Sequence, residues 1–114
     1  MTNDTYRKGL LYEWAAARYL KKKGMQIITR RYRAAGGEID LIALDNDMLV
    51  FVEVKGRRNG RMGAGSAAVD SPKQRRLNDA ADAYIRQYGK ATLFCRFDIM
   101  EITRAGIIHI KNAF

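Results

Sequence analysis

The chain has 114 residues, 47% of them apolar, and a formal net charge of +9. This length fits one domain, residues 1–114, and the apolar fraction excludes global disorder. No apolar run approaches the ~18 residues of a membrane span, and the first residues are polar, so we expect a cytoplasmic protein with no membrane partner. Cys95 and His109 are the only residues of their kinds, which excludes an internal disulfide and a structural zinc site.

The excess of basic residues is the strongest signal in the composition. Twenty-one Lys and Arg against twelve Asp and Glu create a field that attracts polyanions, and nucleic acid is the commonest such partner. The alternatives are a basic protein without that partner, or one that touches a membrane surface. No strongly amphipathic helix of the interfacial type stands out in favour of the membrane.

Apolar periodicity and turn residues predict the order α-β-β-β-α-β-β. We expect helices over residues 4–23 and from Ser71 to Gly89, and strands over 25–33, 38–44, 49–55, 91–103 and 107–114. Ser71 is expected to cap the second helix, with Gln74 completing a capping box. Residues 56–70 contain four glycines and three arginines, which predicts a long loop. The order favours an α/β fold with a mixed central sheet flanked by helices.

The second and third strands form a hairpin that carries unusual charges. If Asn46 and Asp47 are the central turn residues, Asp40 lies opposite Glu53. Alternation then places Glu38, Asp40, Ile42 and Leu44 on the face of Leu49, Phe51, Glu53 and Lys55, with Ile39, Leu41 and Ala43 on the other face.

Opposed carboxylates in this hairpin need compensation. At ~5 Å and an effective dielectric constant near 20, two carboxylates repel by about 3 kcal/mol. A proton, an arginine or a divalent cation could offset this repulsion, and two close carboxylates suit Mg²⁺. The alternative is a buried ion-pair network in which Lys55 neutralises Glu53.

A third acid, Glu13, lies in the apolar stripe of the first helix, among Leu10, Ala16, Ala17 and Leu20. A glutamate there either extends its charge to solvent or adds a ligand to the same cation. Pattern alone leaves both interpretations open.

These residues form a recognisable motif. Asp40, Glu53 and Lys55, in the spacing Asp-x12-Glu-x-Lys after a helix bearing Glu13, resemble the PD-(D/E)xK nuclease superfamily. The segments LLYEWAAARYLKKKG, GGEIDLIA, FVEVKGR, PKQRRL and RFDI, in this order, resemble the YraN family of bacterial, Holliday-junction-resolvase-like proteins. The superfamily's usual proline before the aspartate is replaced by Ile39.

The resemblance implies a restriction-endonuclease-like core and a catalytic set of Glu13, Asp40, Glu53 and Lys55. Asp40, Glu53, the Val54 carbonyl and Glu13 would bind Mg²⁺, with Mn²⁺ as a substitute. Lys55 would orient and help to deprotonate the attacking water. The partner would be branched or double-stranded DNA, and resolvase-like relatives imply a homodimer.

Further basic residues are candidates for nucleic-acid contacts. The start of the second helix carries Lys73, Gln74, Arg75 and Arg76, where a bound phosphate would offset the unfavourable helix dipole; the alternative is a solvated basic face. The long loop carries Arg57, Arg58 and Arg61. Arg30, Arg31 and Arg33 alternate on an expected edge strand, where charge also guards against edge pairing.

Three other residues receive structural interpretations. Asp98 stands in an apolar strand and could join the site, but we expect it to pair with an arginine instead. Cys95 is expected to lie in the core and His109 to lie on the surface. The leading functional hypothesis is a Mg²⁺-dependent, structure-selective DNA endonuclease. The alternatives are a catalytically idle DNA- or RNA-binding module that retains the metal site, and a structural or partner-binding protein.

Overall fold

The computed structural model describes residues 2–56, 69–89 and 94–114. The elements are α1 (Thr2–Lys22), β1 (Gln26–Ala34), β2 (Gly37–Asp45), β3 (Met48–Gly56), α2 (Ser71–Tyr88), β4 (Phe94–Thr103) and β5 (Gly106–Ile110). The predicted order α-β-β-β-α-β-β is confirmed. Neither described helix carries an apolar stretch sufficient to cross a lipid bilayer.

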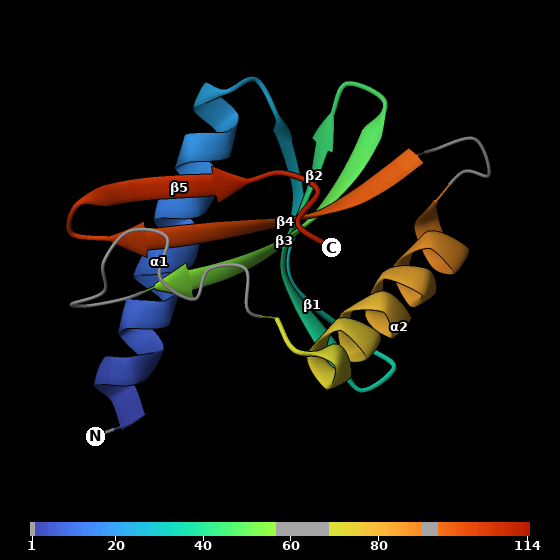
Figure 1. Cartoon of the computed structure of the whole chain (residues 1–114), viewed down its shortest axis with the longest axis horizontal. Coiled ribbons are helices and arrows are strands. Elements are labelled where there is room, and N and C mark those ends of the chain that lie inside the picture. The colour runs from blue at the N-terminus through green and yellow to red at the C-terminus, as the bar shows by residue number, and fades with distance from the viewer. Residues whose placement is uncertain (1, 57–68, 90–93) are drawn as a thin grey trace.

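The described strands form one mixed sheet in the order β1-β2-β3-β4-β5. The pairs β1/β2, β2/β3 and β4/β5 are antiparallel, whereas β3 and β4 are parallel and are joined through α2. Helices α1 and α2 lie on opposite sides of the sheet (Figure 1). The predicted α/β fold with a mixed, helix-flanked sheet is therefore confirmed, and β1 is an edge strand as expected.

The β2/β3 hairpin has the register that its turn residues predict. Leu41 pairs with Val52 and Asp45 with Met48, so Asn46 and Asp47 are the two turn residues. Asn46 has a φ of 54°, a left-handed conformation that asparagine tolerates better than most residues.

Two apolar cores sandwich the sheet. On the α1 side, small residues of α1 let the helix approach the sheet closely; this cluster includes Ala16, Ala17, Leu20, Leu41, Val50, Val52 and Met100. On the α2 side, the cluster includes Ile39, Ile42, Phe51, Leu77, Ala80, Tyr84 and Ile99. Strands β2 and β3 are buried on both faces, which explains their nearly continuous apolar sequences.

The expected alternation along β2 fails at one place. Ile39 packs in the α2-side cluster together with Ile42, whereas Leu41 packs on the α1 side. The expectation that Ile39 shares a face with Leu41 is therefore wrong. On the neighbouring strand β1, Arg31 lies across from Asp40, because the residues on either side of it pair with Leu41 and Ile39. Arg31 has a φ of 53°. Asp40 therefore lies where the alternation of β2 changes sides.

The α2 cap differs by one residue from the expected one. Asp70, not Ser71, is the N-cap, and its side chain accepts a hydrogen bond from the Lys73 backbone N–H at 2.9 Å. The Gln74 side chain donates to the Val69 carbonyl at 2.8 Å instead of completing a capping box. An aspartate caps as well as a serine does, so local sequence did not discriminate between neighbouring positions.

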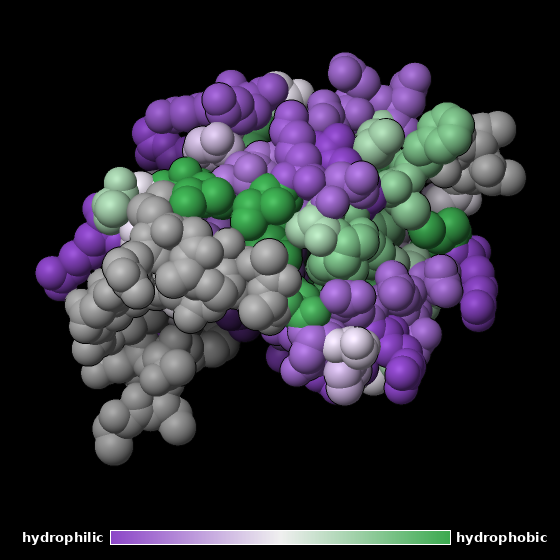
Figure 2. All heavy atoms as spheres, in the orientation of Figure 1, coloured by the Kyte–Doolittle hydropathy of each residue, from purple (hydrophilic) through white to green (hydrophobic). Residues whose placement is uncertain are grey.

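The C-terminal residues do not continue β5. After Ile110 the chain folds back so that the Ala113 N–H donates to the Phe97 carbonyl at 2.7 Å and the ring of Phe114 stacks on Phe97 at 4.8 Å. On the face shown in Figure 2, apolar side chains gather over β5 and the C-terminal end, within a largely polar surround. The strand expected over residues 107–114 is therefore wrong at its C-terminal end, since β5 ends at Ile110.

Candidate metal and nucleic-acid site

The end of the β2/β3 hairpin away from its turn opens into a small, charged cavity. The cavity has a volume of about 200 Å³ and is lined by Gly36, Gly37, Glu38, Asp40, Glu53, Lys73, Arg76 and Leu77. The predicted register put Asp40 directly opposite Glu53; the regular pairing ends at Leu41 with Val52, so these two residues are not a paired position, but both line the cavity. The first turns of α2 contribute the two basic residues.

Asp40 lies just beyond the last regular pair of β2 and β3, Leu41 with Val52. Its Oδ2 accepts a hydrogen bond of 2.7 Å from the Val54 backbone N–H. Burial, followed by the charge of Glu53, raises the pKa of Asp40 from 3.8 to about 8; the Val54 N–H opposes this shift, and Glu13 adds to it. The predicted conflict between these carboxylates is present, and a proton on Asp40 relieves it.

Two bases neutralise the neighbouring acids. Glu53, only 6% exposed, forms an ion pair with the Nζ of Lys73. Glu13, at the side of α1, forms an ion pair of 2.8 Å with the Nε of Arg31. The sequence offered Lys55 as the base that neutralises Glu53; the structure adds Lys73 of α2 as a base in direct contact with this acid.

Lys55 lies two residues beyond Glu53 on β3, next to β4. In the parallel β3/β4 pair its partner position is Glu101, which is fully buried. Sequence reasoning missed this acid. The signal was available, since Glu101 interrupts an apolar strand at the same parity as Phe97 and Ile99.

The donor set can be tested against a metal ion. Within the described ranges, no three Asp, Glu, His or Cys side chains are grouped closely enough to form a metal cluster. Asp40 and Glu53 nevertheless offer two carboxylates beside the Val54 backbone. Mg²⁺ is typically bound through one or two carboxylates while keeping several waters, so the residues fit a hard divalent cation.

The candidate nucleic-acid residues separate into three groups. Lys73 and Arg76 line the cavity. Arg75 is exposed, and Gln74 is engaged with the backbone before α2. Arg57, Arg58 and Arg61 lie outside the described residues, so their predicted contacts stay predictions.

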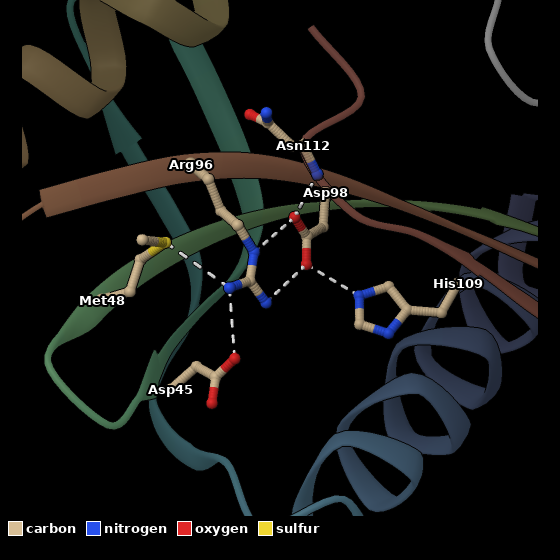
Figure 3. A network of polar contacts seen from close by, with 6 residues as sticks. All are labelled: Asp45, Met48, Arg96, Asp98, His109 and Asn112. Carbon is tan, nitrogen blue, oxygen red and sulfur yellow. Dashed lines mark hydrogen bonds and ion pairs between the residues drawn. The ribbon is translucent and has the colours of Figure 1, made fainter.

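A separate polar network lies on the α1 face (Figure 3). Asp98, fully buried, accepts hydrogen bonds from Arg96 Nε at 2.9 Å and from the Asn112 backbone N–H at 3.0 Å, and its Oδ2 lies 2.7 Å from His109 Nε2. Burial raises the pKa of Asp98, but the bonds from His109, Arg96 and Asn112 outweigh burial and leave the pKa below its ordinary value. The expected pairing of Asp98 with an arginine is confirmed.

Two other expectations for this region are wrong. The His109 side chain is only 6% exposed, and Cys95 is exposed. His109 can be buried because its Nε2 atom has a polar partner in Asp98. The ring of Tyr19 packs against it, with the two ring centres 6.0 Å apart. Cys95 lies near the start of β4, where the burial of the strand has not yet begun.

Comparison with known proteins places the chain in a family. The sequence model of "Uncharacterised protein family UPF0102" matches residues 12–102. A UPF0102 protein of Symbiobacterium thermophilum is 48% identical, covering 95% of this chain and 96% of the relative. One from Herminiimonas arsenicoxydans is 43% identical, covering 92% and 84%. The chain therefore belongs to the UPF0102 family, in agreement with its YraN-like motifs.

Proposed function

We propose that this protein is a metal-dependent nuclease that hydrolyses phosphodiester bonds in nucleic acid, with Mg²⁺ as cofactor and Mn²⁺ as a substitute. The observation that carries the proposal is the shared cavity of Asp40, Glu53, Lys73 and Arg76. Two carboxylates for a divalent cation lie beside two cations that can hold a phosphate group. A net charge of +9 supports a polyanionic substrate.

Asp40, Glu53 and the Val54 carbonyl would hold the metal ion. Glu13 pairs with Arg31 and does not group with these two acids among the described residues, so it would act on the ion through a bound water. When bound, the ion supplies the charge neutralisation and water activation that phosphodiester hydrolysis requires. It would also replace the proton that Asp40 holds because of its raised pKa of about 8. Metal affinity should therefore increase with pH, since deprotonated carboxylates are the ligands.

The basic side chains have distinct tasks in this proposal. Lys73 and Arg76 bind the phosphate oxygens at the cavity, so that the scissile group lies against the carboxylates. Lys55, beside the buried Glu101, stabilises negative charge at phosphorus and helps to remove a proton from the attacking water. The N-terminal backbone of α2 adds a favourable dipole for the phosphate.

The YraN-like motifs extend the proposal to the substrate. We propose branched or double-stranded DNA, cut by a homodimer because two strands of a junction must be cleaved symmetrically. Products would carry 5′-phosphate and 3′-hydroxyl ends, by analogy with the nuclease superfamily.

A cleavage panel tests the proposal. Linear, flapped, four-way and single-stranded DNA, and single-stranded RNA, are incubated with wild type, Asp40→Asn or Glu53→Gln in Mg²⁺, Mn²⁺ or EDTA. Wild type should cut at least one substrate in Mg²⁺ or Mn²⁺ and none in EDTA. Both variants should lose cleavage while remaining folded. Asp82→Asn removes an exposed acid of α2 and should cut normally. Equal cutting by all four proteins would refute the assignment.

The internal ion pairs favour a second candidate, a nucleic-acid-binding module without turnover. Lys73 already neutralises Glu53, and Arg31 neutralises Glu13, so the acids have a structural role without metal. Fluorescence anisotropy with labelled DNA discriminates the two functions. Salt-dependent binding without cleavage of any substrate, in either metal, would establish the module.

A further inference from the structure

A second cavity lies away from the acidic site, between α1 and the edge strand β1. It has a volume of about 590 Å³ and is lined by Arg7, Leu10, Leu11, Trp14 and Arg30. We call this the α1–β1 groove. Four of its residues come from α1, and Arg30 comes from β1.

The floor of the α1–β1 groove is apolar and exposed. Leu11 is 64% exposed, Trp14 50% and Leu10 38%. The intervening acid, Glu13, turns away from the groove toward Arg31. A contiguous exposed patch containing a tryptophan commonly marks a protein interaction site, and Trp and Arg are enriched among residues that dominate binding energy.

The rim of the α1–β1 groove is positively charged. Arg7 and Arg30 line it, and the guanidinium of Arg18 lies 5.4 Å from the centre of the Trp14 ring. No acidic side chain is among the described residues that line the groove. The groove therefore complements a ligand that combines a large apolar side chain with carboxylates.

We propose that the α1–β1 groove binds an acidic segment of a partner protein, with a large apolar side chain against Trp14 and Leu11 and carboxylates against Arg7 and Arg30. The segment would lie along α1 and the edge of β1. This function is independent of the proposed nuclease chemistry, since none of the groove residues lines the acidic cavity.

Two other occupants fit less well. A second copy could offer this groove the exposed acids Asp79 and Asp82, but these share α2 with Arg75 and Arg86, so this helix complements the positive rim of the groove less well than an acidic segment does. A nucleic acid would match the arginines, but the leucine floor offers its polar groups no hydrogen bond.

Peptide selection tests the ligand chemistry. The full-length protein is used to select from a randomised peptide library displayed on phage, with a Trp14→Ala, Leu11→Ser variant as the counter-selection. Enriched peptides should place Leu, Phe or Trp beside Asp or Glu. Enrichment of peptides without acids, or of none that distinguish wild type from the variant, overturns the proposal.

Binding is then measured through Trp14, the only tryptophan of the chain. The strongest selected peptide should change the fluorescence of Trp14. Arg7→Glu with Arg30→Glu should weaken its binding by ~10-fold or more, whereas Arg75→Glu with Arg86→Glu, an equal charge change on exposed positions of α2, should have a much smaller effect. A peptide with its acids changed to lysine should bind the double variant better than wild type. Glu53→Gln should leave peptide binding unchanged.

The remaining outcomes identify a different occupant. If DNA displaces the peptide and its affinity falls in the Trp14→Ala, Leu11→Ser variant, the groove is a nucleic-acid contact and the proposal is wrong. If sedimentation shows a dimer of wild type that Leu11→Ser dissociates, the occupant is a second copy. Circular dichroism of each variant verifies that the fold is intact.

Discussion

The Asp40 carboxylate accepts a hydrogen bond of 2.7 Å from the backbone N–H of Val54. This bond links β2 to β3 just beyond their last regular pair. It also holds the half-buried Asp40 carboxylate near Glu53, where desolvation and the charge of Glu53 raise the pKa of Asp40 to about 8. The same geometry therefore stabilises the hairpin and creates a demand for positive charge.

Asp40→Asn should alter the pH dependence of stability. The folded-state pKa of Asp40, about 8, lies above its ordinary 3.8, so its contribution is fully present below the unfolded value and is lost as the pH rises through about 8. The asparagine variant has no such loss. From pH 5 to pH 9 its free energy of unfolding should improve relative to wild type by ~1 kcal/mol or more.

Urea denaturation at several pH values checks this expectation. Asp47→Asn, in the exposed turn, is the matched control and should follow wild type. Parallel pH profiles for wild type and Asp40→Asn would show that Asp40 is ionised in the folded protein at neutral pH.

The ion pair of Lys73 with Glu53 should be measurable by a double-mutant cycle. Lys73→Met leaves the buried Glu53 without this cation, but Lys73 is 41% exposed and water screens the pair, so we expect destabilisation of only ~1–2 kcal/mol. Glu53→Gln in the same chain should recover part of the loss. Arg75→Met, on the exposed side of α2, should cost little. If the changes in the free energy of unfolding caused by the two substitutions simply add, the ion pair does not contribute to stability.

Gly37→Ala should disturb the contact between β2 and α2. A Cβ on Gly37 would lie 2.4 Å from the Arg76 carbonyl oxygen, and backbone atoms cannot give way easily. We expect a loss of ~1–3 kcal/mol and weaker DNA binding, because the start of α2 carries Lys73 and Arg76. Gly9→Ala in α1 is the control.

The control has a clear expected sign. An added Cβ on Gly9 meets its nearest atom, of Arg31, at 3.9 Å, and alanine favours a helix, so stability should stay equal or rise by ~0.5–1 kcal/mol. Thermal unfolding and DNA anisotropy measure both variants. A Gly37→Ala protein as stable as wild type would mean that α2 does not pack so closely on β2.

Asp98→Asn should destabilise the fold without involving the acidic cavity. It removes a buried charge bound by Arg96, His109 and the Asn112 N–H, which should cost ~3 kcal/mol at pH 7. The pKa of Asp98 is lowered, so its contribution is present above the unfolded pKa and is lost as the pH falls through the folded value. The difference between wild type and variant should thus shrink in acid.

Guanidinium denaturation at neutral and acidic pH measures this effect, with Asp47→Asn as the control. A variant as stable as wild type at pH 7 would show that neutral hydrogen bonds alone hold β4, β5 and the C-terminal residues together.

Local sequence determined the order of the elements and the register of the β2/β3 hairpin. These features follow from turn residues and from periodicities of two and 3.6, which act over a few neighbouring positions. They were enough to place Asp40 and Glu53 near one another and to identify β1 as an edge. The family motifs added the prediction that Glu13 and Lys55 act together with these acids, and this stays a prediction.

Only the tertiary structure decided which side chains pair with the charged residues of the sheet. Lys73 reaches Glu53 because α2 packs back against the sheet. Glu101 takes the partner position of Lys55 in the parallel β3/β4 pair. His109 is buried with its Nε2 atom 2.7 Å from Asp98. Such pairings join segments distant in sequence, so no local period encodes them. The side on which Ile39 packs was likewise decided by the tertiary structure, because Ile39 and Leu41 lie in different cores although they are two residues apart, and simple alternation therefore placed Ile39 on the wrong face.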